Sequence, residues 1–315
     1  MEAAGAGAQV AEWGDVSEAG ERSVTGRQAR DSVSQSAQDL GRAAGGGLLI
    51  GLPLLFTMEM WWHGFLLPHW KILLLLLVTF VIVIGYSALS GFRRDRSLLQ
   101  LLVDAVETMG IAAVVATLAL LALGRIGPEV GLREAVGKVA LQMIPIAFGA
   151  SLAATQLAAP GEDDGDTGSA AGDRAAVGTL GRLFVAAGAA LLFALNVAAT
   201  EEPMLLGIEA GPWLLVAVMI GSYLVTLAIV FYADFRGGRS APIGEGVLSG
   251  PFTETAAAYA ISLVVSLLLL WSFGRTNGMG ISAVVGQVVM LGVVASFGAA
   301  AGRLLVGGGG GEEGT

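Results

Sequence analysis

Six long stretches of the chain contain no charged residue, and this pattern restricts the fold more than any other feature. The stretches are 72–92, 139–161, 183–200, 210–233, 255–274 and 276–302. A helix needs about 20 apolar residues to cross the hydrocarbon core of a bilayer. A soluble core cannot enclose so many helices that are apolar on every side. Only 14% of the residues are charged, against roughly 25% in soluble domains. The sequence therefore predicts an all-α polytopic membrane protein.

We expect about eight transmembrane helices, arranged as two four-helix units. The predicted spans are 45–66, 70–91, 97–124, 132–157, 179–206, 212–234, 248–273 and 280–305. The first, third, fifth and seventh spans contain or adjoin an acidic residue. Six or seven spans therefore remain an alternative, if one of these segments is re-entrant.

The segments outside the two units are poor in large apolar residues. Residues 1–44 cannot bury enough surface to offset the entropy of ordering, so we expect a disordered cytoplasmic segment. Residues 158–178, rich in Gly and Asp, are expected to be an acidic flexible linker between the membrane repeats 45–157 and 179–306. Residues 307–315 are expected to be a flexible tail.

The distribution of Lys and Arg predicts the orientation in the membrane. One side would receive both termini and the loops after spans 2, 4 and 6, and it carries twelve basic residues; the opposite side carries five. The compact loop Phe92-Arg93-Arg94-Asp95-Arg96 is the strongest single indicator. The positive-inside rule then places both termini in the cytoplasm.

The two halves of the chain resemble each other at nearly constant offsets. The sequence VGKVALQMIPIAFGA from Val136 aligns without a gap with VGQVVMLGVVASFGA from Val285, at an offset of 149. At an offset of 143, Thr57, Glu59, Trp70 and Phe92-Arg93 align with Thr200, Glu202, Trp213 and Phe235-Arg236. At an offset of 147, Glu107-Thr108 aligns with Glu254-Thr255. Each repeat would hold an even number of spans, which predicts parallel repeats around a pseudo-two-fold axis along the membrane normal.

Four glutamates in or beside the predicted spans form two repeat-related pairs, Glu59 with Glu202 and Glu107 with Glu254. An ionised carboxylate at the centre of a helix costs roughly 2.5–3.5 kcal/mol even on the translocon-insertion scale, so lipid-facing placement is disfavoured. The functional interpretation makes the four groups a cation or proton pathway about the axis. The structural interpretation makes them hydrogen-bond partners of the neighbouring threonines. The sequence leaves both open.

Three further positions extend this pattern. Asp104 lies three residues before Glu107 and shares its helical face; at an offset of 147 its counterpart is Pro251, which we expect to mark a helix start or an opened stretch of backbone. Asn196 is a candidate pathway residue deep in the fifth span, although most such amides join neighbouring helices. Pro203, directly after Glu202, indicates a break in that span.

The segment Met58–His63 combines Glu59 with two indoles and an imidazole, but it offers too few ligands at suitable spacing to predict a metal site. Trp61, Trp62, Trp70 and Trp213 are typical of an aromatic belt at the outer membrane interface. The chain has no Cys, which excludes disulfides and thiolate chemistry. The absence of HExxH, a Ser/His dyad and GxxxxGK[ST] argues against an enzyme or a directly ATP-driven pump.

Several segments resemble an uncharacterised family of bacterial integral membrane proteins. They are GLPLLFTMEMWW, NVAATEEPMLL, GPFTETAAAYAISLVVSLLLLW and GAAAGRL. The resemblance covers most of residues 45–306 and implies a multi-pass protein of the bacterial inner membrane. It brings no established activity and no site residues.

We therefore expect a cation or proton-coupled channel or transporter, with Glu107 and Glu254 flanking a central path. The alternative is a non-transporting membrane scaffold that recruits a partner. The expected partners are the lipid bilayer and an inorganic cation or proton, and homo-oligomerisation remains open. No cofactor is expected, and the net charge of −9 argues against nucleic acid.

Overall fold

The computed structural model of the protein describes residues 38–90, 97–157, 179–236 and 251–307. Its helices are Gln38–Leu55, α2 (Met58–Leu66), α3 (His69–Ser90), α4 (Leu98–Ala122), α5 (Leu132–Leu157), α7 (Thr179–Ala198), α8 (Glu202–Glu209), α9 (Pro212–Arg236), α10 (Pro251–Ser272) and α11 (Ile281–Gly307). Residues 38–44, expected to be disordered, belong to the first helix. The predicted linker 158–178, residues 1–37 and residues 308–315 lie outside the described residues.

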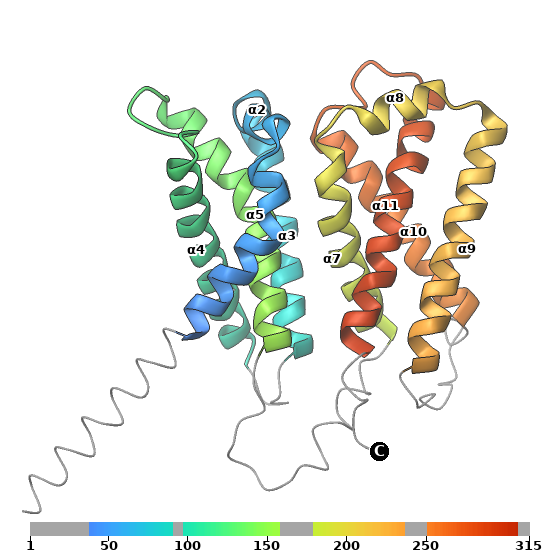
Figure 1. Cartoon of the computed structure of the whole chain (residues 1–315), viewed down its shortest axis with the longest axis horizontal. Coiled ribbons are helices and arrows are strands. Elements are labelled where there is room, and N and C mark those ends of the chain that lie inside the picture. The colour runs from blue at the N-terminus through green and yellow to red at the C-terminus, as the bar shows by residue number, and fades with distance from the viewer. Residues whose placement is uncertain (1–37, 91–96, 158–178, 237–250, 308–315) are drawn as a thin grey trace, which may run out of the picture.

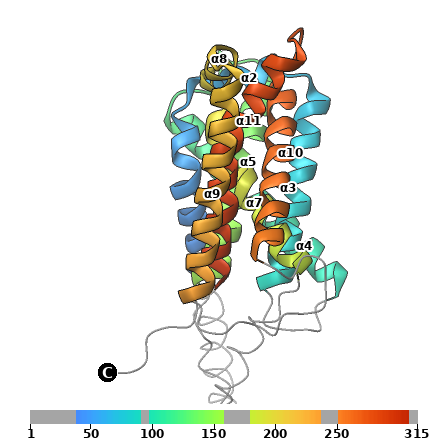
Figure 2. The ribbon, with the colours of Figure 1, turned by 90° about the vertical axis from the view of Figure 1, so that its right-hand side faces the viewer.

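The helices are long and apolar enough for a multi-span membrane protein, as predicted. Six of them can cross a bilayer, and the number rises to eight if each of two bent pairs counts as one span. The long helices run alternately up and down (Figures 1 and 2), and the chain enters the first helix and leaves α11 at the same end. The short helices α2 and α8 both lie at the opposite end, one in each group of helices, and we call this the α2/α8 end.

Both bent pairs occur where a continuous span was predicted. The Gln38–Leu55 helix and α2 meet at 86°, and α7 and α8 meet at 85°. Pro203 lies in the first turn of α8, where its missing N–H costs nothing, whereas inside a continuous helix its ring would clash with the preceding turn. The break predicted at Pro203 is confirmed. Pro251 likewise begins α10, so the helix start predicted there is confirmed too.

Glycines allow α5 and α11 to approach their neighbours at backbone contact. A Cβ on Gly137 of α5 would collide with the carbonyl oxygen of Gly64 in α2, and a Cβ on Gly286 of α11 would collide with that of Gly207 in α8. Gly149 and Gly298, farther along α5 and α11, face the first helix and α7 in the same way. Van der Waals packing through small residues is the usual means of joining helices in a bilayer.

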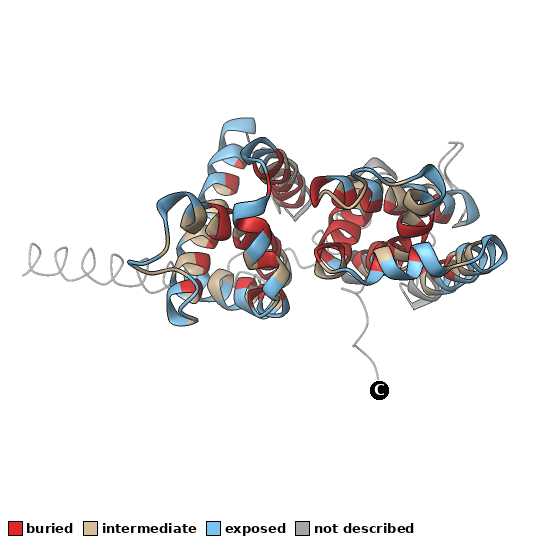
Figure 3. Cartoon of the chain, turned by 90° about the horizontal axis from the view of Figure 1, so that it is seen from above, coloured by how far each residue is buried: buried red, intermediate tan, exposed pale blue. Residues whose placement is uncertain are grey.

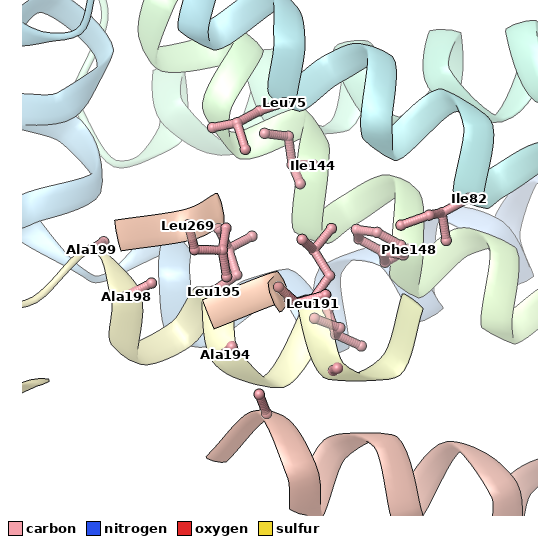
Figure 4. Close-up of a cluster of buried hydrophobic side chains, with 14 of the residues drawn as sticks. Leu75, Ile82, Ile144, Phe148, Leu191, Ala194, Leu195, Ala198, Ala199 and Leu269 are labelled. Atoms are coloured by element: carbon pink, nitrogen blue, oxygen red, sulfur yellow. The ribbon is translucent and has the colours of Figure 1, made fainter. Parts of the chain in front are cut away.

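The two groups of helices share one buried core. The first half comprises the Gln38–Leu55 helix and α2–α5, and the second half comprises α7–α11. In one continuous cluster, Leu75 and Ile82 of α3 and Phe148 of α5 pack with Leu191 of α7 and Leu269 of α10 (Figure 4). Seen from above, the two groups lie side by side with buried residues inside each of them (Figure 3). The interface is formed by α3 and α5 on one side and α7 and α10 on the other.

This interface does not show the predicted two-fold axis. If the halves are repeats, α3 aligns with α9 at the predicted offset of 143, and α4 aligns with α10 at the predicted offset of 147. A two-fold axis would therefore match the contact between α3 and α10 with one between α9 and α4. Instead, α4 and α9 lie at opposite edges of the molecule (Figure 1). The halves meet through non-equivalent faces, which is a heterologous arrangement. An even number of spans fixes the direction in which each half crosses, but it does not fix the rotation between the halves.

Candidate functional site

The carboxylates predicted to line a common path lie in different surroundings. Glu254 is buried in the first turn of α10, with 6% of its surface exposed. Glu107 is exposed on α4, at the outer edge of the first half. Glu59 is half-buried in the first turn of α2, and Glu202 is exposed at the start of α8. Glu107 and Glu254 therefore do not flank a central path.

The ends of α4 and α10 show which of their residues correspond. Gly124 and Gly274 both follow a helix with a positive φ, of 65° and 76°. The amide of Arg125 donates to the carbonyl of Leu120 at 2.8 Å, and the amide of Arg275 donates to that of Leu270 at 2.8 Å. These are the same C-terminal capping motif, a Schellman motif, and they lie 150 residues apart.

At an offset of 150, Asp104 rather than Glu107 corresponds to Glu254. Each lies 20 residues before the capping glycine of its helix. Asp104 is half-buried and Glu254 is buried. The offset of 147 predicted from the shared Glu-Thr dipeptide differs from this one, and both would hold only with three extra residues inside a continuous helix. At the offset of 150, the residue aligned with Pro251 is Leu101.

Burial along the two helices supports this register. The pairs Ala105/Thr255, Ala112/Ser262, Ala116/Ser266 and Leu120/Leu270 are all completely buried. The pairs differ in chemistry, however, because α10 carries a hydroxyl at three positions where α4 carries a methyl group. Thr255, Ser262 and Ser266 lie on one face of α10, since they are spaced by seven and four residues.

These hydroxyls belong to a row of buried polar groups in the second half, which we call the polar column. Its members are Glu254, Thr255, Tyr259, Ser262 and Ser266 of α10 and Ser222 and Thr226 of α9. The Ser222 and Tyr259 hydroxyl oxygens lie 2.7 Å apart and join the two helices. Ser262 donates to the carbonyl of Ala258 and Ser266 to that of Ser262, both at 2.8 Å. Each donating hydroxyl keeps oxygen lone pairs that can accept a proton or bind a cation.

Toward the α2/α8 end, the second half also holds most of the buried polar atoms that lack a partner. Among the described residues these atoms are Asn196 Oδ1, Ser272 Oγ, Arg275 Nε and both side-chain polar atoms of Gln287, whereas the first half contributes Gln142 Oε1. Gln287 is completely buried, and its backbone lies against Gly207 of α8. Buried polar atoms of this kind are normally satisfied by water or a ligand.

A pocket of about 580 Å³ opens between the two halves at the α2/α8 end. It is lined by His63, Leu66, Leu67, Pro68, Trp70, Lys71, Trp271, Phe273, Gly274, Arg275 and Asn277. The first six come from α2, α3 and their connection, and the rest from the end of α10 and the loop after it. The lining contains two cationic side chains and no carboxylate.

Lys71 lies between two indole rings in this pocket. Its Nζ donates to the carbonyl of Trp271 at 2.5 Å, and it lies 4.8 Å from the Trp271 ring and 5.7 Å from the Trp70 ring. The two rings meet edge to face at 5.3 Å. His63 packs edge to face on Phe273 at 4.8 Å, and its Nδ1 donates to the carbonyl of Glu59 at 2.6 Å. The two cationic side chains of the lining are Lys71 and Arg275, and Arg275 Nη1 lies 3.6 Å from a carboxylate oxygen of Glu201.

Cationic side chains near this end serve a second purpose, which is to cap helix C-termini. Arg275 donates to the carbonyl of Ala199, after α7, at 2.7 Å, and Lys138 donates to that of Arg125, after α4, at 3.0 Å. Lys71 does the same for α10. Positive charge at the C-terminus stabilises a helix by interacting with its dipole. The cations therefore fix the helix ends as well as charging the pocket.

Residues 39–306 match the family described as "Putative integral membrane protein (DUF2391)". The chain belongs to this family. The family description gives a membrane location and a domain of unknown function, in agreement with the resemblance found in the sequence. No curated protein and no solved structure matches the chain.

Sequence reasoning missed Lys71 and Arg275 as site residues, because it treated both as loop charges that report orientation. It assigned Trp70 to an aromatic belt and His63 to an incomplete metal site. One signal was present, since Lys71 directly precedes the uncharged stretch 72–92. A lysine joined to an apolar helix near the membrane is expensive unless it finds a partner. Trp62, Trp70 and Trp213 are exposed at the α2/α8 end, which fits an aromatic belt.

Proposed function

We propose that this integral membrane protein conducts a cation or protons, and that the pathway follows the polar column of the second half. The observation that carries the proposal is the burial of Glu254 at one end of a row of buried hydroxyl oxygens on α10. This retains the transport function expected from the sequence, but it replaces a path between Glu107 and Glu254 with one inside a single half.

The chemistry of the column suits a cation or a proton rather than an anion. A carboxylate and several hydroxyl oxygens are the ligands that hard cations prefer. The hydroxyls of Ser262 and Ser266 use their hydrogens on carbonyls of their own helix. Their free lone pairs therefore present negative partial charge to the neighbouring space. Asn196 and Gln287 extend the polar groups toward the α2/α8 end.

We propose that the two halves are repeats, and that the second has acquired the polar groups. Support comes from backbone contacts at matching offsets. Gly64 and Gly207 are 143 residues apart, and their contacts Gly137 and Gly286 are 149 apart. The capping glycines after α4 and α10 are 150 apart. In chain order the offset is 143 in α2, 150 after α4 and 149 in α5, and these changes fall between helices, as they would if insertions and deletions occurred in loops.

The excess of Lys and Arg in the segments that the sequence assigns to the side of the termini supports placing both termini in the cytoplasm of a bacterial inner membrane. The proposal assigns no catalysis to the chain, since the sequence offers no Cys, no HExxH and no Ser/His dyad.

The scaffold alternative rests on a specific observation. Ser222 and Tyr259 bond directly across α9 and α10, and Ser262 and Ser266 bond within their own helix. A column that only holds helices together would satisfy its hydroxyls in this way. Hydrogen bonds of this kind contribute about 0.6 kcal/mol each in membrane proteins.

A flux assay in liposomes separates the two functions. The uptake of protons, Na⁺ and K⁺ is compared for the wild type, Glu254→Gln and the matched control Glu107→Gln. We expect Glu254→Gln to lower the flux of the transported ion at least about tenfold, because it removes the only buried carboxylate among the described residues. Glu107→Gln should leave the flux unchanged, because its side chain is exposed. The absence of flux under every gradient would favour the scaffold, and equal flux in both variants would remove Glu254 from the pathway.

A further inference from the structure

The pocket between the halves contains a cation whose charge no neighbouring carboxylate balances. Lys71 is 6% exposed, and the described residues offer it one carbonyl and two indole faces but no ion pair. A buried charge without a counter-charge is costly. Its surroundings therefore suit an anion that the protein chain itself does not supply.

Lys138 shows what a purely structural lysine looks like in the same chain. It is 7% exposed, and it also donates to a carbonyl just beyond a helix end. Its Nζ, however, lies 2.5 Å from a carboxylate oxygen of Glu134. Both lysines cap a helix at the same end of the molecule, but only Lys138 has its charge neutralised. Of these two lysines, Lys71 is therefore the one whose charge an external anion could balance.

The pocket also contains hydrogen-bond donors that no acceptor of the described residues uses. The ammonium group of Lys71 has three N–H donors, and the structure uses one of them, on Trp271. Arg275 donates to the carbonyl of Ala199 and lies 3.6 Å from a carboxylate oxygen of Glu201, while its buried Nε has no partner among the described residues. Asn277 adds an exposed side-chain amide. Cationic N–H groups and amides are the donors that phosphate oxygens accept most strongly.

The position of the pocket and its apolar wall restrict the kind of anion that it can bind. The pocket lies at the α2/α8 end, where the exposed Trp62 and Trp213 indicate the level of the membrane interface. The indoles of Trp70 and Trp271 supply an apolar wall beside the charge. Lys71 comes from the first half and Arg275 from the second, so one ligand would contact both halves.

We propose that this pocket binds the phosphate group of an amphiphilic phosphate ester, with its organic part against the two indoles. The phosphate belongs either to a lipid headgroup or to a soluble phosphate ester. Lys71 is the principal partner, Arg275 and Asn277 complete the set of donors, and the bound phosphate links the two halves. This site is separate from the polar column, so its occupancy is measured without any flux assay.

The test titrates each probe into the purified full chain in neutral detergent and measures the melting temperature of the protein at every probe concentration. The probes are phosphatidylglycerol, phosphatidylcholine, glycerol phosphate and inorganic phosphate. We expect a saturable rise in melting temperature with phosphatidylglycerol and little change with the zwitterionic phosphatidylcholine. Saturation with phosphatidylglycerol alone assigns a lipid headgroup, and saturation with glycerol phosphate as well assigns a soluble ester. No saturable response, or an equal response to phosphatidylcholine, would overturn the proposal.

Variants locate the site. Lys71→Gln should weaken binding by about tenfold to a hundredfold, which is the range for a lost hydrogen bond to a charged group, and Lys71→Arg should restore most of it. Lys138→Gln is the matched control, expected to lower the melting temperature of the free protein and leave the affinity unchanged. If Lys71→Gln does not fold, Asn277→Asp provides the second variant, since it adds a negative charge at an exposed loop position. Unchanged affinity in Lys71→Gln, or in Asn277→Asp, would contradict the assignment.

Discussion

The two halves of this protein share a helical frame, but their interiors differ. In both, a long helix contacts a short cross-wise helix through paired glycines, and another long helix ends in a positive-φ glycine followed by arginine. In the first half, the buried face of α4 carries Ala105, Ala112 and Ala116. In the second half, the same positions on α10 carry Thr255, Ser262 and Ser266.

This difference shows which features the common helix arrangement requires and which it does not. Backbone-to-backbone crossings and helix caps occur in both halves, so they belong to the architecture. The first half also buries Thr79 and Ser151. At the positions that align with Thr255, Ser262 and Ser266, however, α4 carries alanine, so helix packing at these positions does not require a hydroxyl. The presence of these three hydroxyls in the second half is therefore the feature that most needs a functional explanation.

The largest change in stability is expected from filling the glycine contacts that both halves share. Gly137→Leu in α5 and Gly286→Leu in α11 should each destabilise the protein by about 3 kcal/mol or more, because overpacking cannot be relieved where the obstacle is a backbone carbonyl. Thermal unfolding in detergent measures the loss. The two variants should behave alike, since Gly64 and Gly207 lie opposite them in the same way. A large effect in one half alone would show that the two crossings are not equivalent.

A smaller effect is expected from making the second half resemble the first. The triple variant Thr255→Ala, Ser262→Ala, Ser266→Ala should keep the fold, because α4 packs with alanine at all three positions. It should lower ion flux by about tenfold, since each lost hydroxyl removes roughly 0.5–1.5 kcal/mol of polar interaction. Liposome flux and thermal unfolding are measured together. The reciprocal change, Ala105→Ser, Ala112→Ser, Ala116→Ser, serves as the control and should not alter flux. Unchanged flux in the alanine variant would remove these hydroxyls from the pathway, and unchanged flux with lowered stability would assign them a structural role.

Much of the fold was accessible from sequence, because lipid imposes a simple rule on length and charge. The uncharged stretches located the crossing helices, and proline chemistry located the break at Pro203 and the start of α10. The structure favours another register between α4 and α10 than the one predicted. A shared Glu-Thr dipeptide suggested one offset, whereas the helix caps and the buried positions require another. In uniformly apolar helices, two identical residues carry little information about which face is buried.

The candidate site was less accessible, because it depends on contacts between residues far apart in the chain. Lys71 donates to a carbonyl of Trp271, and Arg275 to one of Ala199. Backbone acceptors at helix ends leave no residue-type signature in the sequence. The sequence did identify Glu254 and Asn196 as polar groups within spans. It could not show that Glu107, with the same residue type on the corresponding helix, faces outward.

The smallest effect concerns a surface position that differs between the same two helices. Gly110 of α4 and Ala260 of α10 correspond at the offset of 150, and both are exposed. No atom lies within 4 Å of a Cβ placed on Gly110, so Gly110→Ala changes helix propensity without changing packing. It should stabilise the protein by about 0.5–1 kcal/mol, and Ala260→Gly should destabilise it by a similar amount. Thermal unfolding of the two variants measures both shifts. Shifts of opposite sign and similar size would support the register, whereas a destabilising Gly110→Ala would show that α4 packs closely at this position and that the two sites are not equivalent.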